Sequence, residues 1–160
     1  MRNLKIAIAA LTVTMTVLVS GATFSADVED IIEARQSFMR VYAFNLGIVG
    51  AMAKGKTEYN QELASSAAQN LIALSKMENS AMWPEGSSKA AEGLSDKTDA
   101  LEEMWTTWPE VKNRHEEAAK AIEAFAMLAA KDLESLRGGM KDLGAGCKGC
   151  HKDFRAKDED

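Results

Sequence analysis

Four segments of this chain carry apolar residues at helical spacing, and this pattern limits its fold more than any other feature. Apolar positions that recur at intervals of three and four lie on one face of an α-helix. The segments cover residues 27–54, 61–77, about 110–129 and from 132 onward. The expected core positions include Phe38, Leu63, Leu71, Phe125 and Leu136. No segment shows the alternation of a half-buried strand, so the pattern predicts an all-α protein.

Proline and glycine mark one long connection between the second and third segments. Pro84 and Pro109 are the two prolines of the chain. The connection is expected to run from Gly86 to about Pro109, with a short helix near residues 99–105. Because the other two joins are short, the helices should form two antiparallel pairs. The sequence therefore predicts an up-down-up-down four-helix bundle over residues 27–157.

The fourth segment leads into Cys147-Lys148-Gly149-Cys150-His151, the CxxCH pattern by which a c-type haem is attached. Cys147 and Cys150 would each form a thioether to the porphyrin, and His151 would be the proximal iron ligand. A structural zinc site needs four ligands, and the chain adds only the distant His115. A thioredoxin-like pair expects a βαβ setting, and a plain disulfide leaves the histidine unexplained. The motif favours one covalently bound haem c.

The N-terminus has the features of a secretory signal peptide. Basic residues precede an uncharged and mostly apolar run over residues 6–19, and Ser20-Gly21-Ala22 supplies small residues for cleavage. We expect residues 1–22 to be removed, with cleavage as late as Ser25 as an alternative. A membrane anchor is the competing interpretation, but the run is shorter than the ~20 residues needed to span a bilayer. The chain should therefore be exported to the periplasm without stable insertion in the membrane.

Charge limits the partners. The chain has 19 basic and 24 acidic residues, and loss of Arg2 and Lys5 with the signal peptide takes the formal charge from −5 to −7. An acidic protein is a poor ligand for nucleic acid or an anionic membrane. Residues 158–160 form an acidic tail. Basic residues nevertheless gather around the motif and could steer docking of a periplasmic redox protein, although a solvated helix face explains them equally well: Lys148, Lys152, Arg155 and Lys157.

Two residues of the first helix are candidates to meet the haem. Arg35 interrupts the apolar stripe, and Met39 lies one turn later on the same face. An arginine in that position needs a partner charge, which a haem propionate could provide, whereas the alternative is an arginine that extends to the rim. His115 is a rival iron ligand, because it lies one turn after Val111 on the third helix.

The chain resembles the class II c-type cytochromes, the family of cytochrome c′ and its low-spin, six-coordinate relatives. The strongest resemblance is the C-terminal signature from Gly144 through CxxCH to Phe154-Arg155. Glu103-Met104-Trp105 is similar to the tryptophan-bearing segment before the family's third helix, and Ala34-Arg35-Gln36-Ser37 to its first-helix motif. The stretch over residues 46–55 is most similar to the low-spin members.

The resemblance implies roles for individual residues. Cys147 and Cys150 would anchor the haem, His151 would bind the iron, and Arg35 and Arg155 would lie near the propionates or the proximal imidazole. Met39 falls on the position that covers the distal side. Some members of the family dimerise through their first two helices, so a homodimer is a further expectation.

Coordination decides the function. If Met39 binds the iron, both axial positions are filled and the protein is a one-electron carrier. If Met39 only covers an open site, the protein is a five-coordinate module that binds NO or CO. A peroxidase-like enzyme would need a distal acid/base, for which only His115 could serve. We expect an electron carrier with His151/Met39 coordination rather than an enzyme.

Overall fold

A computed structural model describes residues 26–157 and consists of helices and connecting loops. The long helices are α1 (Val28–Ala53), α2 (Gln61–Lys76), α4 (Trp108–Ala129) and α5 (Leu133–Phe154). Two short helices, η1 (Ser80–Met82) and α3 (Glu103–Thr106), lie in the connection between α2 and α4. The expected signal peptide (residues 1–22) and acidic tail (residues 158–160) lie outside the described residues.

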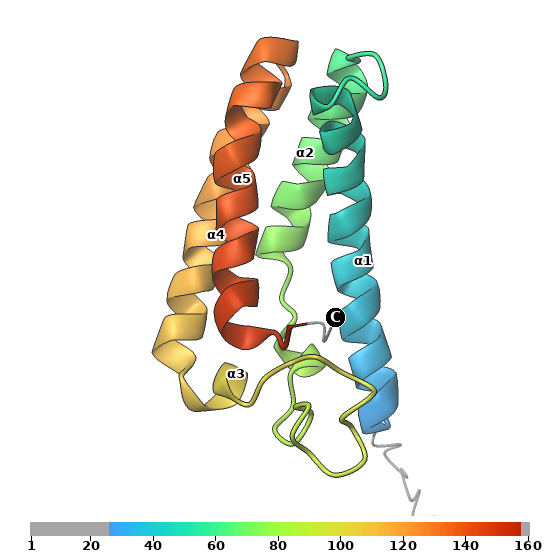
Figure 1. The fold of residues 1–160 in the computed structure, drawn as a ribbon, viewed down its shortest axis with the longest axis vertical. Helices are drawn as coiled ribbons and strands as arrows, with labels where there is room; N and C mark the ends of the chain where they lie inside the picture. Colours follow the sequence, from blue (N-terminus) through green and yellow to red (C-terminus); the bar gives the residue numbers. More distant parts are fainter. Residues whose placement is uncertain (1–25, 158–160) are drawn as a thin grey trace, which may run out of the picture.

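The long helices form the predicted bundle (Figure 1). Each packs against two neighbours, so that the order around the bundle is α1, α2, α4, α5 and back to α1. Short loops join α1 to α2 and α4 to α5 at one end, and the long connection crosses the other end. Since α5 runs towards that second end, the CxxCH motif lies beside the connection. The up-down-up-down prediction is confirmed.

Polar side chains begin three of the helices. Asp27, Asn60 and Asp132 are the N-cap residues of α1, α2 and α5, and each accepts a hydrogen bond from a backbone N–H of the first turn. Such caps satisfy donors that have no partner within the helix. At the other end of α1, Gly55 has a φ of 68°, a left-handed conformation that ends the helix at low cost.

The main hydrophobic core lies towards the short-loop end of the bundle. Its buried members come from all four long helices, with alanines on α2 and larger side chains on α4 and α5. The largest fully buried side chains are Phe125, Met52, Leu71, Leu136, Leu143 and Val49. The motif end depends on a different set of contacts, those of the connection.

Two boundary predictions and one core prediction need correction. The third helix begins at Trp108 and includes Pro109 in its first turn. Proline is tolerated there because backbone N–H groups of the first turn have no partner within the helix. The short helix covers residues 103–106 rather than 99–105. Leu63 is 47% exposed, because the small side chains of Ala64, Ala67 and Ala68 form the inward face of α2. Among residues 26–157, no helix is long and apolar enough to cross a membrane.

The connection is fastened to the end of α5 by backbone hydrogen bonds. Leu101 N–H donates to Phe154 C=O (3.0 Å), and Ala156 N–H donates to Asp99 C=O (2.8 Å). Ala100 and Arg155 form an isolated antiparallel bridge. Within the connection, Lys89 N–H donates to Ala100 C=O (2.7 Å). The segment that follows the motif therefore pairs with the connection.

Candidate haem-binding site

The CxxCH motif occupies the last two turns of α5. Cys147 and Cys150 are free thiols, both of intermediate exposure, and their i, i+3 spacing places them on one side of the helix. His151 is exposed and lies one turn before the helix ends at Phe154. The helix thus presents two thiols and an imidazole within two turns, beside its exposed end.

Desolvation shifts the pKa values of the groups of the motif towards their neutral forms. The pKa of the Cys147 thiol is raised mainly by desolvation. The pKa of Cys150 is raised by desolvation and by the nearby Asp153 and Cys147, with Arg114 acting in the opposite direction. Desolvation, followed by the positive charge of Arg155, lowers the pKa of His151. A lowered pKa favours the neutral imidazole, which is the form that binds metals.

Helix α1 faces the motif through Tyr42. Desolvation is the main reason that the pKa of Tyr42 is raised to about 12, and the charge of Cys147 on α5 contributes to the shift. The Tyr42 ring also packs edge-on against Phe38, with 5.3 Å between the ring centroids. Met39 precedes Tyr42 by three residues, so the two lie on neighbouring parts of one helix face. The Met39 side chain is 38% exposed.

Arg35 is buried in a pocket made by the connection, with only 3% of its surface exposed. Its terminal nitrogens donate to Met82 C=O (3.4 Å), Ser87 Oγ (3.1 Å), Ser87 C=O (3.0 Å) and Thr98 Oγ1 (2.8 Å). Burial lowers the pKa of its guanidinium. All four acceptors are neutral, so the partner charge expected from the sequence is not among these protein contacts. The propionate roles of Arg35 and Arg155 remain predictions.

His115 does not lie where the apolar stripe of its helix predicts. The residue is exposed on α4, whereas Val111, one turn earlier, is buried. The buried side chains of α4 resume only at Ile122, so the turn that carries His115 is not part of the buried face. The expectation that His115 belongs to the apolar face is wrong.

Several residues around the motif were not identified from the sequence. Arg114 on α4 donates to Asp153 (3.1 Å), which lies directly after the motif on α5, and to Glu117 (3.1 Å). It also forms an ion pair with Glu110. The helical spacing of Glu110 and Glu117 about Arg114 is visible in the sequence. The pairing with Asp153, and the contacts of Ser87 and Thr98 with Arg35, depend on how distant segments pack.

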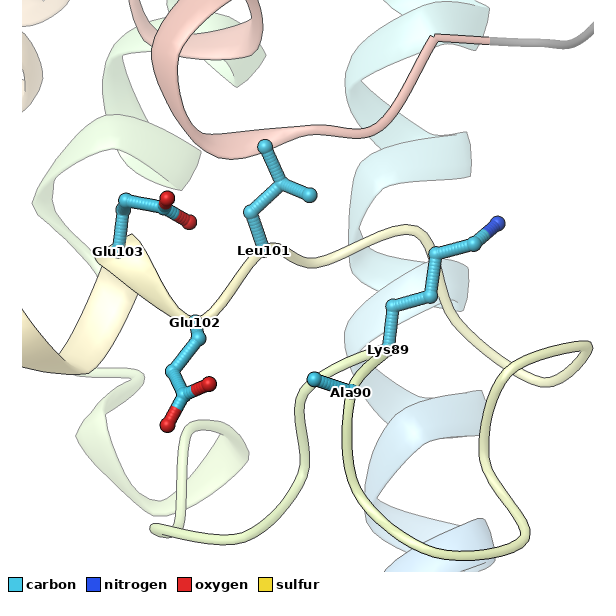
Figure 2. A pocket seen from close by; sticks show the side chains of 5 residues that line it. All are labelled: Lys89, Ala90, Leu101, Glu102 and Glu103. Carbon is cyan, nitrogen blue, oxygen red and sulfur yellow. The ribbon is translucent and has the colours of Figure 1, made fainter.

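The donor set suits a covalent haem better than an isolated metal ion. Within residues 26–157, no three histidine, cysteine or acidic side chains gather as ligands of one ion. The two thiols and one imidazole instead match what CxxCH supplies to a single porphyrin. A separate open cavity of about 340 Å³ lies between the connection and α3 (Figure 2). Its lining residues belong to neither the motif nor α1: Lys89, Ala90, Leu101, Glu102 and Glu103.

Known proteins are similar to this chain in sequence and in fold. A curated cytochrome c-554 from Cereibacter sphaeroides is 37% identical over 131 residues, which are 82% of this chain and 96% of the relative. A solved cytochrome c′ from Rhodobacter spheriodes superposes with a TM-score of 0.76 at 29% identity, covering 83% of this chain and all of the other. A solved cytochrome c′ described by its ligand-controlled dimer dissociation gives a TM-score of 0.73 at 28% identity, with coverage of 83% and 99%.

The family assignment follows from the sequence match together with the bundle. The family profile described as cytochrome C′ matches residues 30–155, from the third residue of α1 to the residue after α5. The matched region contains Arg35, Met39, the connection and the complete CxxCH motif. The chain belongs to the cytochrome c′ family.

Proposed function

We propose that this chain is a one-electron carrier in which His151 and Met39 fill the two axial positions of the iron. Members of the cytochrome c′ family bind one haem c covalently. The observation that supports the proposal is the packing of α1 against α5, in which Tyr42 of α1 is half-buried. Met39 lies on the same part of α1, so its thioether is on the helix that faces the motif.

The residues of the site have separate tasks in this proposal. Cys147 and Cys150 would hold the haem, and the neutral imidazole of His151 would bind from the proximal side. When bound, the haem supplies the one-electron couple, and thioether ligation favours its reduced state. Met39 and His151 would be presented by two long helices, α1 and α5, which would limit the rearrangement needed between oxidation states. No substrate is transformed, so the chain acts as a carrier and not as an enzyme.

The exposure of Met39 keeps a gas-binding function as the second candidate. A side chain that is 38% exposed is free to turn away from the iron and act as a lid over an open site. In that case NO or CO would bind on the distal side. A peroxidase-like activity ranks lowest, because His115, the one histidine besides His151, is exposed on α4.

The coordination is tested by Met39→Ala, with Met77→Ala as the matched control. Met77 is exposed to a similar degree, 41% against 38%, but lies at the end of α2. Met39→Ala is expected to convert low-spin iron to high-spin iron, to open the site to CO and to lower the reduction potential, since the thioether is lost. The Met77→Ala spectrum should match the wild type. An unchanged Met39→Ala spectrum would remove this residue from the coordination sphere.

The proposed location is the periplasm, and the proposed partners are periplasmic redox proteins. The basic residues at the motif support this, since the nearby Asp153 carboxylate is already paired with Arg114. Lys148, Lys152 and Arg155 are exposed around that pair. Their charges are therefore available to attract an acidic surface in spite of the negative net charge of the chain.

A homodimer through α1 and α2 is part of the proposal. Val41 and Phe44 on α1 are 47% and 69% exposed, and Leu63 on α2 is 47% exposed. Exposed apolar side chains of this size on adjacent helices favour association. A solved relative is described by the dissociation of its dimer, which supports a second copy of this chain as the occupant of that face.

A further inference from the structure

We propose that Arg35 is a positioning residue. By binding the connection, it fixes the distance between α1, which carries Met39, and α5, which carries His151, so that both side chains can reach one iron. The proposal rests on the proposed coordination by Met39. It differs from a propionate contact, because Arg35 would act through protein partners that are not themselves iron ligands. Those partners are Met82, Ser87 and Thr98 of the connection, together with two tryptophan rings.

The hydrogen bonds show how the guanidinium joins the connection to α1. Arg35 Nη1 donates to Ser87 Oγ and Met82 C=O, and Nη2 donates to Ser87 C=O and Thr98 Oγ1. Ser87 and Thr98 are themselves buried, with 0% and 6% exposed. One charged group thus holds three residues of the connection, of which Ser87 and Thr98 are eleven positions apart. Hydrogen bonds from a charged donor are stronger than neutral ones, and a buried donor that loses its partner is costly.

Two tryptophans complete the site around the guanidinium. The central carbon of Arg35 lies 4.6 Å from the ring centroid of Trp83 and 6.0 Å from that of Trp105. The Trp105 indole N–H donates to Trp83 C=O (3.0 Å), which ties the two ends of the connection together. A planar, delocalised cation suits this combination of ring stacking and a four-acceptor set, whereas a lysine ammonium does not.

The same connection is bonded to the chain directly after the motif. Leu101 N–H reaches Phe154 C=O, and Ala156 N–H reaches Asp99 C=O. Phe154 is three residues beyond His151, and Thr98 precedes Asp99. In Figure 2 the Leu101 side chain points from the connection towards the segment that follows α5. A continuous series of short contacts therefore leads from Arg35, one turn before Met39, to the turn that carries His151.

This geometry predicts what happens when the series is broken. Without the bonds to Ser87 and Thr98, the hydrogen bonds that still join the first turns of α1 to the connection include the long one from Arg35 Nη1 to Met82 C=O (3.4 Å) and the exposed one from Gln36 Nε2 to Lys97 C=O (2.7 Å). Helix α1 would then move relative to α5 more easily, and Met39 would leave the iron more often. Coordination by Met39 should weaken without any change in the residues at the iron.

The test uses Ser87→Ala and Thr98→Val in the haem-loaded protein, with Ser88→Ala as the control. Ser88 is the next residue of the same connection and is also buried, but it accepts no bond from Arg35. Loss of one charge-assisted hydrogen bond should raise the fraction of reduced protein in which Met39 is off the iron and CO can bind roughly tenfold. The low-spin fraction should fall in Ser87→Ala and Thr98→Val, and Ser88→Ala should match the wild type. Arg35→Lys should show the same changes in CO binding and in low-spin fraction, because a lysine ammonium does not suit the four acceptors.

Amide hydrogen exchange provides a readout that does not depend on the iron. Exchange at Leu101 and Ala156 should become faster in Ser87→Ala and Thr98→Val, while amides near Phe125 in the main core keep their wild-type rates. If Ser87→Ala and Thr98→Val stayed low-spin and bound CO no more readily than the wild type, the positioning role of Arg35 would be wrong, while the coordination by Met39 would stand. A high-spin wild type would overturn the proposed coordination and the positioning of Met39 with it. Wild-type CO binding and a wild-type low-spin fraction in Arg35→Lys would show that only the charge of Arg35 matters, and would also contradict the proposal.

Discussion

Single side chains at the two ends of α5 hold the motif in place. Asp132 begins the helix by accepting the Ser135 N–H (2.7 Å). Near the other end, Asp153 pairs with Arg114 of α4 (3.1 Å). Arg114 also lies over the motif, with its Cδ 3.8 Å from the position of a Cβ on Gly149. A side chain at residue 149 would therefore contact Arg114.

The cap at Asp132 predicts a pH dependence of stability. Hydrogen bonds from the Ser135 backbone and side chain lower the pKa of Asp132 below its ordinary value of 3.8. A carboxylate with a depressed pKa stabilises the folded state above pH 3.8, and this contribution disappears as the pH falls through the folded-state pKa. Asp132→Ala should lower the Tm at pH 7, and the difference from wild type should shrink at acidic pH.

Asp132→Asn is the control for this cap, because asparagine accepts the same hydrogen bond without a charge. Its Tm at pH 7 should exceed that of Asp132→Ala. Thermal unfolding followed by circular dichroism at pH 7 and pH 3 measures both differences. A deficit of Asp132→Ala that stays constant over this range would show that the carboxylate charge has no part in the cap.

At the scale of residues, the sequence supports a prediction for the motif but not for its surroundings. Cys147, Cys150 and His151 could be assigned to a haem because their spacing is local and belongs to one helix. The partners of Arg35 were not, because Ser87 and Thr98 lie more than fifty residues away and have no unusual local pattern. Arg35 was expected to need a charged partner, yet carbonyls, hydroxyls and indole rings surround it.

At the scale of helices, α4 and α5 approach closely at two glycines. A Cβ on Gly139 would meet Phe125 Cδ2 at 2.9 Å, and one on Gly146 would meet Ala118 Cα and Ala121 Cβ at 3.1 Å each. Gly146 directly precedes Cys147. The absence of a side chain at that position thus allows α4 to pack against the turn that presents the first thiol.

Gly146→Ala is therefore expected to destabilise the protein, with Gly144→Ala as the matched control. The new methyl group at residue 146 meets the backbone of α4, and such overpacking costs about 1–3 kcal/mol. Nothing lies within 4 Å of a Cβ at residue 144, so that substitution should stabilise the helix by about 0.5–1 kcal/mol. Denaturant unfolding gives both free energies. Equal changes at the two positions would contradict the close approach described for residue 146.

Helix positions followed from the sequence because the periodic segments are long. The ends of α1 and α2 were predicted to within a few residues, since Asp27, Gly55 and Asn60 are local signals. The error at Leu63 has a different origin: alanine carries a weak hydrophobic signal, so the larger leucine was assigned to the core. The path of the connection over Arg35 could not be predicted, because it depends on contacts with both α1 and α5.

The whole molecule is divided into a packed half and a functional half. The main core lies towards the short loops, whereas the motif, the connection and Arg35 lie at the other end. This division lets side chains at the functional end be polar or exposed without loss of the principal core. It also places the exposed Val41 and Phe44 of α1 between the two halves, on the face proposed for a second copy.

Phe44→Lys tests that interface, and Met127→Lys is its control. Both native side chains are 69% exposed, but Met127 is on α4. Loss of a large apolar side chain from an interface, with a charge in its place, should raise the dimer Kd roughly tenfold or more. Sedimentation velocity over a concentration series measures this change. A monomeric wild type, or equal effects of the two substitutions, would remove α1 from the interface.

The central claim, that Met39 completes the coordination of the iron opposite His151, is tested most directly by the optical spectrum of the haem-loaded wild-type protein. The ferric and ferrous forms should be recorded before and after addition of CO. The account predicts sharp low-spin bands in both oxidation states that CO does not change. High-spin bands that shift on addition of CO would contradict it, and would identify an open, gas-binding site in which Met39 is only a distal lid.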